Sequence, residues 1–165
     1  MKIALSIAFV LHSLGCLCQP MRDSLKLSPL VRTVANEIKE LTSNDSLYWV
    51  NEKKYKKELK VLEQRAKAFE LVILLSHSSP YVRVNAFNLL LSLHYPKFID
   101  VLEAKINDDG RIIFHDWDCG YVITTVARQM AEFVTLNNKW VGNVTLNDED
   151  MRRLSNAIDK ILELE

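Results

Sequence analysis

The chain has 165 residues, and its 21 lysines and arginines are balanced by 21 aspartates and glutamates, so the formal net charge is zero. A chain without a basic excess lacks the positive face that nucleic-acid binding requires, which excludes that class of partner. Three cysteines are too few for a disulfide framework, so the fold must depend on a hydrophobic core. Glycine and proline number only four each, which favours helices over turn-rich β structure.

Residues 1–18 have the features of a secretory signal peptide. Lys2 supplies the positive charge, and residues 3–11 form an apolar core shorter than the ~20 residues that span a bilayer. Small residues at positions 13 and 15 precede Cys16. This arrangement resembles a bacterial lipoprotein signal, which implies lipidation of Cys16; cleavage after Cys18 is the alternative. The mature chain is therefore expected outside the cytoplasm, as a periplasmic or membrane-anchored lipoprotein or as a secreted protein.

The remaining residues, 19–165, have the length of a single domain. The state of its thiols depends on the cleavage site. Lipidation of Cys16 leaves Cys18 and Cys119, which can pair only if the N-terminus folds back on the body. Cleavage after Cys18 leaves Cys119 as a free thiol. Contact with a membrane is expected only through the N-terminal lipid.

Two helices are predicted in the first half of the domain. Ser28 and Pro29 are suited to the start of a helix that runs to Leu41. A longer helix is predicted from residue 47 or 51 to residue 76, with a heptad-like seam of Tyr55, Leu59, Leu62, Ala66, Phe69 and Ile73. Near its start, glutamates alternate with Lys53, Lys54, Lys56, Lys57 and Lys60. Mixed charges of this kind favour a solvated face over a patch that binds anionic lipid.

The segment 78–93 predicts a helix buried on two sides. Ser79 suits the N-cap and Pro80 the first helical position. One apolar face contains Val82, Ala86, Leu89, Leu90 and Leu93, and a second contains Val84, Phe87 and Leu91. A helix that is apolar on two faces must lie between neighbouring elements.

The pattern S-P-x-V-R-x-x-A-x-x-x-L at 79–90 resembles the second helix of a HEAT-type α-solenoid repeat. In that family an aspartate precedes the proline and forms a ladder with the arginine. Here Ser79 holds the aspartate position, whereas Arg83 keeps the arginine position. A second, degenerate copy follows about 40 residues later, a spacing within the range of such repeats. It predicts a helix that starts at Gly120 and runs to Val134; an ordinary helical bundle is the alternative.

Two further helices complete the pattern. Pro96 opens one, with a stripe of Phe98, Ile99, Leu102 and Ile106 that ends near Gly110. Asn147 is the expected N-cap of the last, whose inward residues are predicted to be Met151, Leu154, Ile158, Ile161 and Leu162. A terminal helix with a charged outer face is what an α-solenoid needs to close its end.

One irregular insertion, at 109–119, interrupts the helices and is predicted to be extended. Insertions between the helices of a repeat usually lie on one face, often the binding face. The candidate partner-binding residues are Arg111, Phe114, His115, Asp116, Trp117 and Asp118. The alternative is a metal- or thiol-dependent enzyme centred on His115, Asp116, Asp118 and Cys119. The paired spacing of zinc sites and every nucleophile motif are missing, so no cofactor or metal is expected.

These observations predict an all-α protein, built as a short HEAT-like α-solenoid with one insertion. The expected function is non-catalytic: a protein-binding module of the cell envelope, such as an immunity or inhibitor protein, that acts through the solenoid groove and the insertion. A purely structural envelope component, whose repeats stack only on themselves, is the third possibility.

Overall fold

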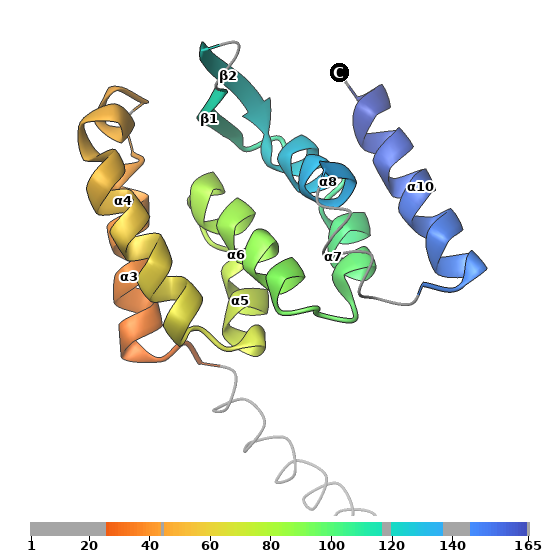
Figure 1. The fold of residues 1–165 in the computed structure, drawn as a ribbon, viewed down its shortest axis with the longest axis horizontal. Coiled ribbons are helices and arrows are strands. Elements are labelled where there is room, and N and C mark those ends of the chain that lie inside the picture. Colours follow the sequence, from red (N-terminus) through yellow and green to blue (C-terminus); the bar gives the residue numbers. More distant parts are fainter. Residues whose placement is uncertain (1–25, 44, 117–119, 137–145, 165) are drawn as a thin grey trace, which may run out of the picture.

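The computed structural model describes residues 26–43, 45–116, 120–136 and 146–164, with side chains for all of these except 45–50, 114–116 and 120–121. Within these ranges the chain forms seven helices and one two-stranded sheet, so the all-α prediction is confirmed (Figure 1). The helices are α3 (Pro29–Leu41), α4 (Asp45–Arg65), α5 (Ala68–Leu74), α6 (Pro80–Ser92), α7 (Phe98–Ala104), α8 (Val126–Leu136) and α10 (Asp148–Glu163). The strands are β1 (Arg111–Asp116) and β2 (Gly120–Thr125). In the part of the chain so described, no helix combines the length and apolarity needed to span a membrane.

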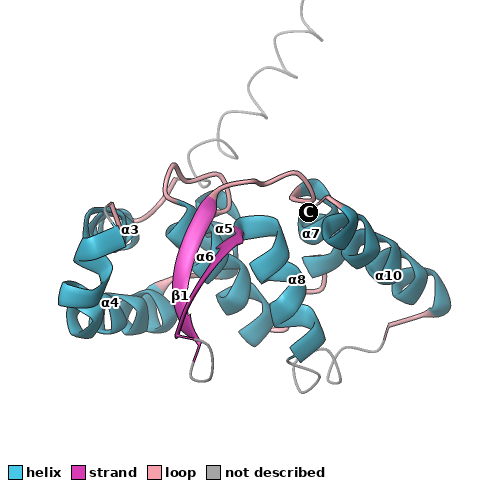
Figure 2. Ribbon diagram, turned by 90° about the horizontal axis from the view of Figure 1, so that it is seen from above, coloured by secondary structure: helices cyan, strands magenta, loops and turns pink. Residues whose placement is uncertain are grey.

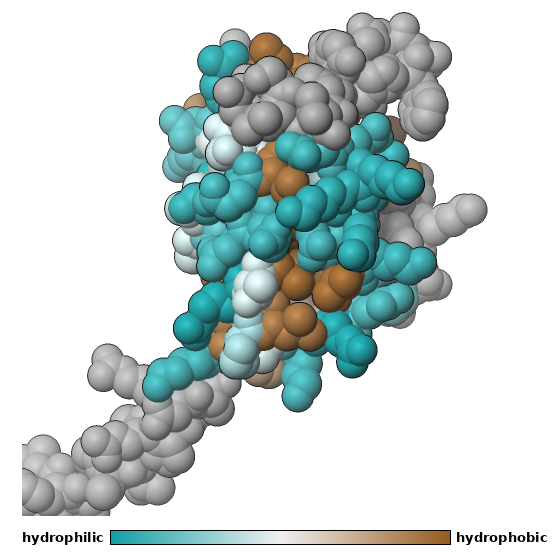
Figure 3. Space-filling view, turned by 90° about the vertical axis from the view of Figure 1, so that its left-hand side faces the viewer, coloured by the Kyte–Doolittle hydropathy of each residue, from teal (hydrophilic) through white to brown (hydrophobic). Residues whose placement is uncertain are grey.

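The helices follow one another in a row of pairs. Helix α3 packs along α4, α5 along α6, and α10 closes the row against α7 and α8 (Figures 1 and 2). The cap predicted for α3 is present. The Ser28 hydroxyl accepts a hydrogen bond from the Val31 amide, and Pro29 occupies the first turn. The surface that the α3–α4 end presents is mainly hydrophilic, with a narrow apolar band (Figure 3). The five lysines of α4 are all exposed, as a solvated face requires.

The predicted long helix is in fact two helices, α4 and α5, separated at residues 66–67. Glu70 stabilises this break: one carboxylate oxygen accepts from the Lys67 amide at 3.0 Å and the other from the Ser28 amide at 2.9 Å. This buried carboxylate therefore caps α5 and fixes the start of α3. The heptad-like seam is wrong at Phe69, which is 39% exposed, whereas Ala66 still packs against the core.

Helix α6 lies at the centre and is buried on both faces, as predicted. It contacts α3, α5, α7, α8 and β1. Val82, Ala86, Phe87 and Leu90 are inaccessible to solvent. Only Leu93, which follows the helix, departs from the predicted face, because it is exposed.

The insertion between α7 and α8 is an antiparallel hairpin of β1 and β2, in which Ile112 pairs with Thr124 and Ile113 with Ile123. The helix predicted from Gly120 therefore starts six residues later, at Val126. The β-branched run Val122-Ile123-Thr124-Thr125 favours a strand once a partner strand is available. The base of the hairpin is closed by the Val126 amide, which donates to the Gly110 carbonyl at 2.9 Å.

Helix α10 begins as predicted, because the Asn147 side chain accepts from the Asp150 amide at 2.8 Å. Its inner face contains Leu154, Ala157 and Ile161. Met151 and Leu162 were predicted to face inward, and this is wrong, since they are 53% and 50% exposed. They flank the buried stripe on a helix that packs on one side only.

Candidate functional site

The hairpin is fixed to the helical body by one tyrosine. The Tyr81 hydroxyl on α6 accepts from the Ile113 amide at 2.9 Å and donates to the Ile113 carbonyl at 3.2 Å. Both backbone groups of Ile113 are thus paired by a single side chain that is itself buried. The neighbouring cross-strand pair, Ile112 and Thr124, is buried against the body. The hairpin is therefore a docked element of the fold, and its base forms the wall of a pocket.

This space, termed the hairpin pocket, lies where α4, α6, β1 and α8 meet. Its volume is about 160 Å³. Eight residues line it: Tyr55, Tyr81, Val84, Asn85, Ile112, Ile113, Gln129 and Phe133. Three of them are aromatic and three are aliphatic, and two carry side-chain amides. An apolar pocket with a few fixed polar groups is the usual form of a site that recognises one small group.

A buried amide fixes two walls of the hairpin pocket. The Asn85 side-chain NH2 donates to the Tyr55 hydroxyl at 2.7 Å and to the Tyr81 carbonyl at 2.7 Å. Asn85 is 7% exposed, so these bonds are shielded from water. Because Tyr81 in turn holds Ile113, the network runs from α4 through α6 to β1. The pocket walls are thus preorganised by hydrogen bonds.

Gln129, a residue of the opposite wall, carries an oxygen that is closed to solvent and, within the described chain, unpaired. Gln129 on α8 is 8% exposed, and its Oε1 has no hydrogen-bond partner among the residues that the structure describes. The Thr124 hydroxyl on β2 is in the same state. A buried acceptor left unpaired costs about 1–3 kcal/mol.

A charged contact links the hairpin base to the turn before α6. The Arg83 guanidinium binds Asp108 through two hydrogen bonds of 2.8 Å and 2.7 Å, and also donates to the His77 carbonyl at 2.8 Å. Both charged side chains are largely buried, at 13% and 11% exposed. A Cβ added to Gly110 would lie 2.2 Å from Arg83 Nη2, so glycine is needed at that close approach. Burial lowers the pKa of His77, and the charges of Lys39 and Arg83 lower it further, which favours the neutral imidazole.

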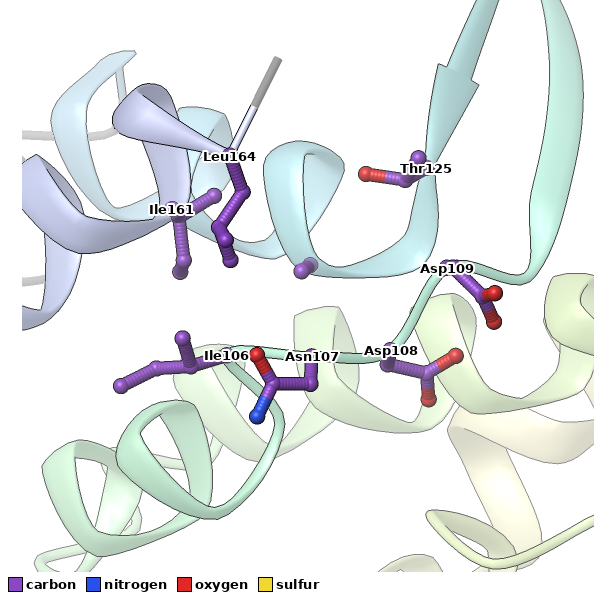
Figure 4. Close-up of a pocket in the computed structure, with 8 residues that line it drawn as sticks. Ile106, Asn107, Asp108, Asp109, Thr125, Ile161 and Leu164 are labelled. Atoms are coloured by element: carbon purple, nitrogen blue, oxygen red, sulfur yellow. The ribbon is translucent and has the colours of Figure 1, made fainter.

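A second pocket lies on the other side of the hairpin base, between the turn after α7 and the end of α10 (Figure 4). Its volume is about 240 Å³. Ile161 of α10 and Leu164, which directly follows that helix, point toward the turn that contains Asn107 and Asp109 (Figure 4). Asp108 also lines this pocket, but Arg83 already occupies its carboxylate, whereas Asn107 and Asp109 are exposed to water. Although it is larger, this pocket has, among its described residues, no counterpart of the buried Asn85–Tyr55 hydrogen bond that holds the walls of the hairpin pocket.

The structure places only part of the predicted partner-binding set. Arg111 is exposed at the start of β1. Phe114, His115 and Asp116 continue β1 opposite Val122, Tyr121 and Gly120, and for these three the description is confined to the backbone. Trp117, Asp118, Cys119 and the lipidation candidate Cys16 lie outside the described residues.

The metal- or thiol-dependent centre therefore stays a prediction. Residues 26–43, 45–116, 120–136 and 146–164 contain no group of three or more His, Cys, Asp or Glu that could hold a metal ion. His115, Asp116, Asp118 and Cys119 are not covered by that statement, because their side chains are outside the described set.

Sequence reasoning missed the residues that build the hairpin pocket. The signal was a polar residue within an apolar helical stripe. Asn85 interrupts the two apolar faces of α6, and Gln129 lies between Val126 and Met130 on the buried face of α8. Nothing local indicated that both would line one space with Tyr55.

Comparison with known protein families, curated proteins and solved structures gave no match. The class of this protein is thus defined by its own fold: a helical protein with a docked β-hairpin that covers a small, aromatic-lined pocket.

Proposed function

We propose that this chain is a non-catalytic protein-binding module that takes a partner segment against the hairpin and into the hairpin pocket. The observation that carries the proposal is a mainly apolar pocket whose walls are held in place by the hydrogen bonds of Asn85 to Tyr55 and to the Tyr81 carbonyl. Binding sites on proteins are typically preformed apolar pockets with a few polar groups that fix orientation. The Tyr55–Asn85–Tyr81 network supplies that preformation.

A short HEAT-like α-solenoid is the architecture that we propose for the stack. Consecutive helix pairs support it, as does the contact between Arg83 and Asp108. In the HEAT family the arginine at this position forms a ladder with the aspartate that precedes the proline. Asp108 comes from the turn that follows the next helix, so a carboxylate reaches Arg83 although Ser79 replaces the usual aspartate.

We also propose export to the cell envelope, with Cys16 as a lipidation site or with cleavage after Cys18. Within the cell envelope, the specific function that we propose for a small, neutral, helical binding protein is that of an immunity or inhibitor protein. The intact mass of the mature protein tests this directly. A mass that starts at Cys16 with added acyl chains supports lipidation, one that starts at Gln19 supports secretion, and an unprocessed chain refutes both.

Affinity capture tests the binding proposal. The mature wild type is immobilised beside Val84→Phe, which fills the hairpin pocket, and Trp117→Ala, which removes an aromatic residue of the hairpin segment. Leu164→Ala, on the rim of the second pocket, is the matched control. We expect a partner that wild type and control retain from envelope extract and that Val84→Phe loses at least tenfold. Equal recovery by all four proteins would show that the pocket is not the binding site.

A further inference from the structure

The two edges of the hairpin differ in how their backbone groups are paired. Strand β1 lies on the α4 side of the hairpin, and β2 lies on the side away from α4 (Figures 1 and 2). On β1, the Tyr81 hydroxyl takes up the outward amide and carbonyl of Ile113. Among the described residues the sheet has only these two strands, so no strand lies on the outer side of β2. The edge of β2 is therefore the one to which a further strand can add.

The hydrogen bonds of the hairpin show which backbone groups of β2 point outward. In an antiparallel sheet, facing residues alternate between pairs that exchange hydrogen bonds and pairs that do not. The Val126 amide donates to the Gly110 carbonyl, so this pair is bonded. Three positions further along β1 the backbone of Ile113 turns to Tyr81 instead, so its pair with Ile123 is not bonded. The amide and carbonyl of Ile123 thus point away from β1, and no described residue pairs with either group.

The sequence of β2 does not protect this edge. Natural edge strands usually avoid pairing with other chains by means of charged residues, proline or a bulge. Residues 120–125, GYVITT, contain no charge and no proline, and their register with β1 is unbroken. The Ile123 side chain is 56% exposed. An open, uncharged edge of mainly β-branched residues is a template for a further strand.

A second copy of the same strand satisfies this edge. An antiparallel copy centred on Ile123 exchanges both hydrogen bonds between the two Ile123 residues, and it places Val122 opposite Thr124. The residues of these facing pairs are all β-branched, a combination that stabilises sheets. A charged strand from another protein would find no counter-charge in residues 120–125. The whole chain has no net charge, so two copies do not repel each other.

We infer that this chain forms a two-fold dimer through β2, in which the two hairpins join into one sheet with the strand order β1-β2-β2-β1. The dimer goes beyond the proposed binding function and leaves it intact. The hairpin pocket is lined by β1, through Ile112 and Ile113, so pairing at the edge of β2 does not cover it. Because the interface uses few residues, the dimer is weak and forms in concentrated protein.

Sedimentation and hydrogen exchange of the mature chain from Gln19 test the inference, in reducing buffer so that no intermolecular disulfide forms. Between about 10 μM and about 1 mM protein, we expect the sedimentation coefficient to shift from that of a monomer to that of a dimer. Over the same range, exchange at the Ile123 amide should slow roughly fivefold as the dimer forms. The Ile113 amide, which is already bonded to Tyr81, should keep the same rate.

Substitutions at position 123 test the backbone pairing itself. Ile123→Pro removes the outward amide and leaves the bonds between β1 and β2 in place, because proline is tolerated in a strand where its missing N–H would face solvent. By symmetry it removes two intermolecular hydrogen bonds, so the association constant should fall roughly thirtyfold. Ile123→Val, the matched control, keeps the amide and should change that constant by less than about threefold. Ile123→Lys keeps the backbone and places like charges opposite each other, which repeats the test if proline disturbs the hairpin.

Three results would overturn the inference. The first is a monomer at every concentration. The second is a dimer whose association constant is undiminished in Ile123→Pro or in Ile123→Lys, since another surface then forms it. The third is protection of the Ile123 amide only after envelope extract is added, which assigns the edge of β2 to a strand of another protein.

Discussion

Replacement of Tyr81 by phenylalanine removes one oxygen atom and tests how the hairpin is attached. That hydroxyl pairs both the amide and the carbonyl of Ile113. A buried backbone group without a partner costs about 1–3 kcal/mol, but this site is only partly buried, so water can pair some of what is lost. We therefore expect the free energy of unfolding to fall by about 1.5–3 kcal/mol, measured by urea denaturation at neutral pH.

Hydrogen exchange at the Ile113 amide separates a local effect from a global one. Because Tyr81→Phe loosens the hairpin first, exchange at Ile113 should accelerate at least about tenfold, while amides in the middle of α6 change only as much as global stability does. Tyr95→Phe, at a partly buried tyrosine away from the hairpin, is the control, and its stability should change by less than about 0.5 kcal/mol. Unchanged Ile113 protection together with a loss below about 0.5 kcal/mol would refute the clamp.

Three further substitutions test the contacts that set the fold. Asp108→Ala leaves the Arg83 guanidinium largely buried without its counter-charge, so the free energy of unfolding should fall by about 3 kcal/mol in urea denaturation; a loss below about 1 kcal/mol contradicts a buried pair. In Gly110→Ala the added methyl group meets the same guanidinium, so the free energy of unfolding should fall by about 1–3 kcal/mol. This loss should be smaller when Arg83→Leu is already present; an equal loss with Arg83 and with Leu at position 83 contradicts the clash. Burial alone would raise the pKa of Glu70, but hydrogen bonds from two backbone amides outweigh it and lower that pKa. The lowered pKa stabilises the fold above the ordinary pKa of a glutamate, and this gain disappears as the pH falls through the folded value. Glu70→Gln should therefore lose about 1–2 kcal/mol at pH 7 and show a flatter acid profile; parallel acid profiles would contradict this.

Local chemistry was enough to predict where several helices begin. Ser28, Pro80 and Asn147 each fit the start of a helix through the residue itself, and α3, α6 and α10 start there. The two-faced burial of α6 was also readable, because eight apolar residues at helical spacing leave little surface for water. These features depend on neighbours within a few positions of one another.

Features that depend on distant partners were not readable. The break between α4 and α5 requires a carboxylate at Glu70 that also binds the amide of Ser28, 42 positions away. Residues 120–125 have a helical apolar period, yet they form a strand because β1 offers backbone partners. The hairpin pocket has the same origin: Tyr55, Asn85 and Gln129 meet only after three helices have packed.

The closure at Gly110 and Val126 has a consequence for how such a protein can diversify. The chain departs from the stack and rejoins it at one point, since the Val126 amide reaches the Gly110 carbonyl at 2.9 Å and the Ala127 amide reaches that of Asp108 at 3.1 Å. Segment 111–125 is thus an insertion whose two ends are held together by backbone hydrogen bonds. Outward-facing positions such as Ile123 can be exchanged while α7 and α8 keep their positions, whereas Ile112 and Thr124 belong to the packed body and must be kept.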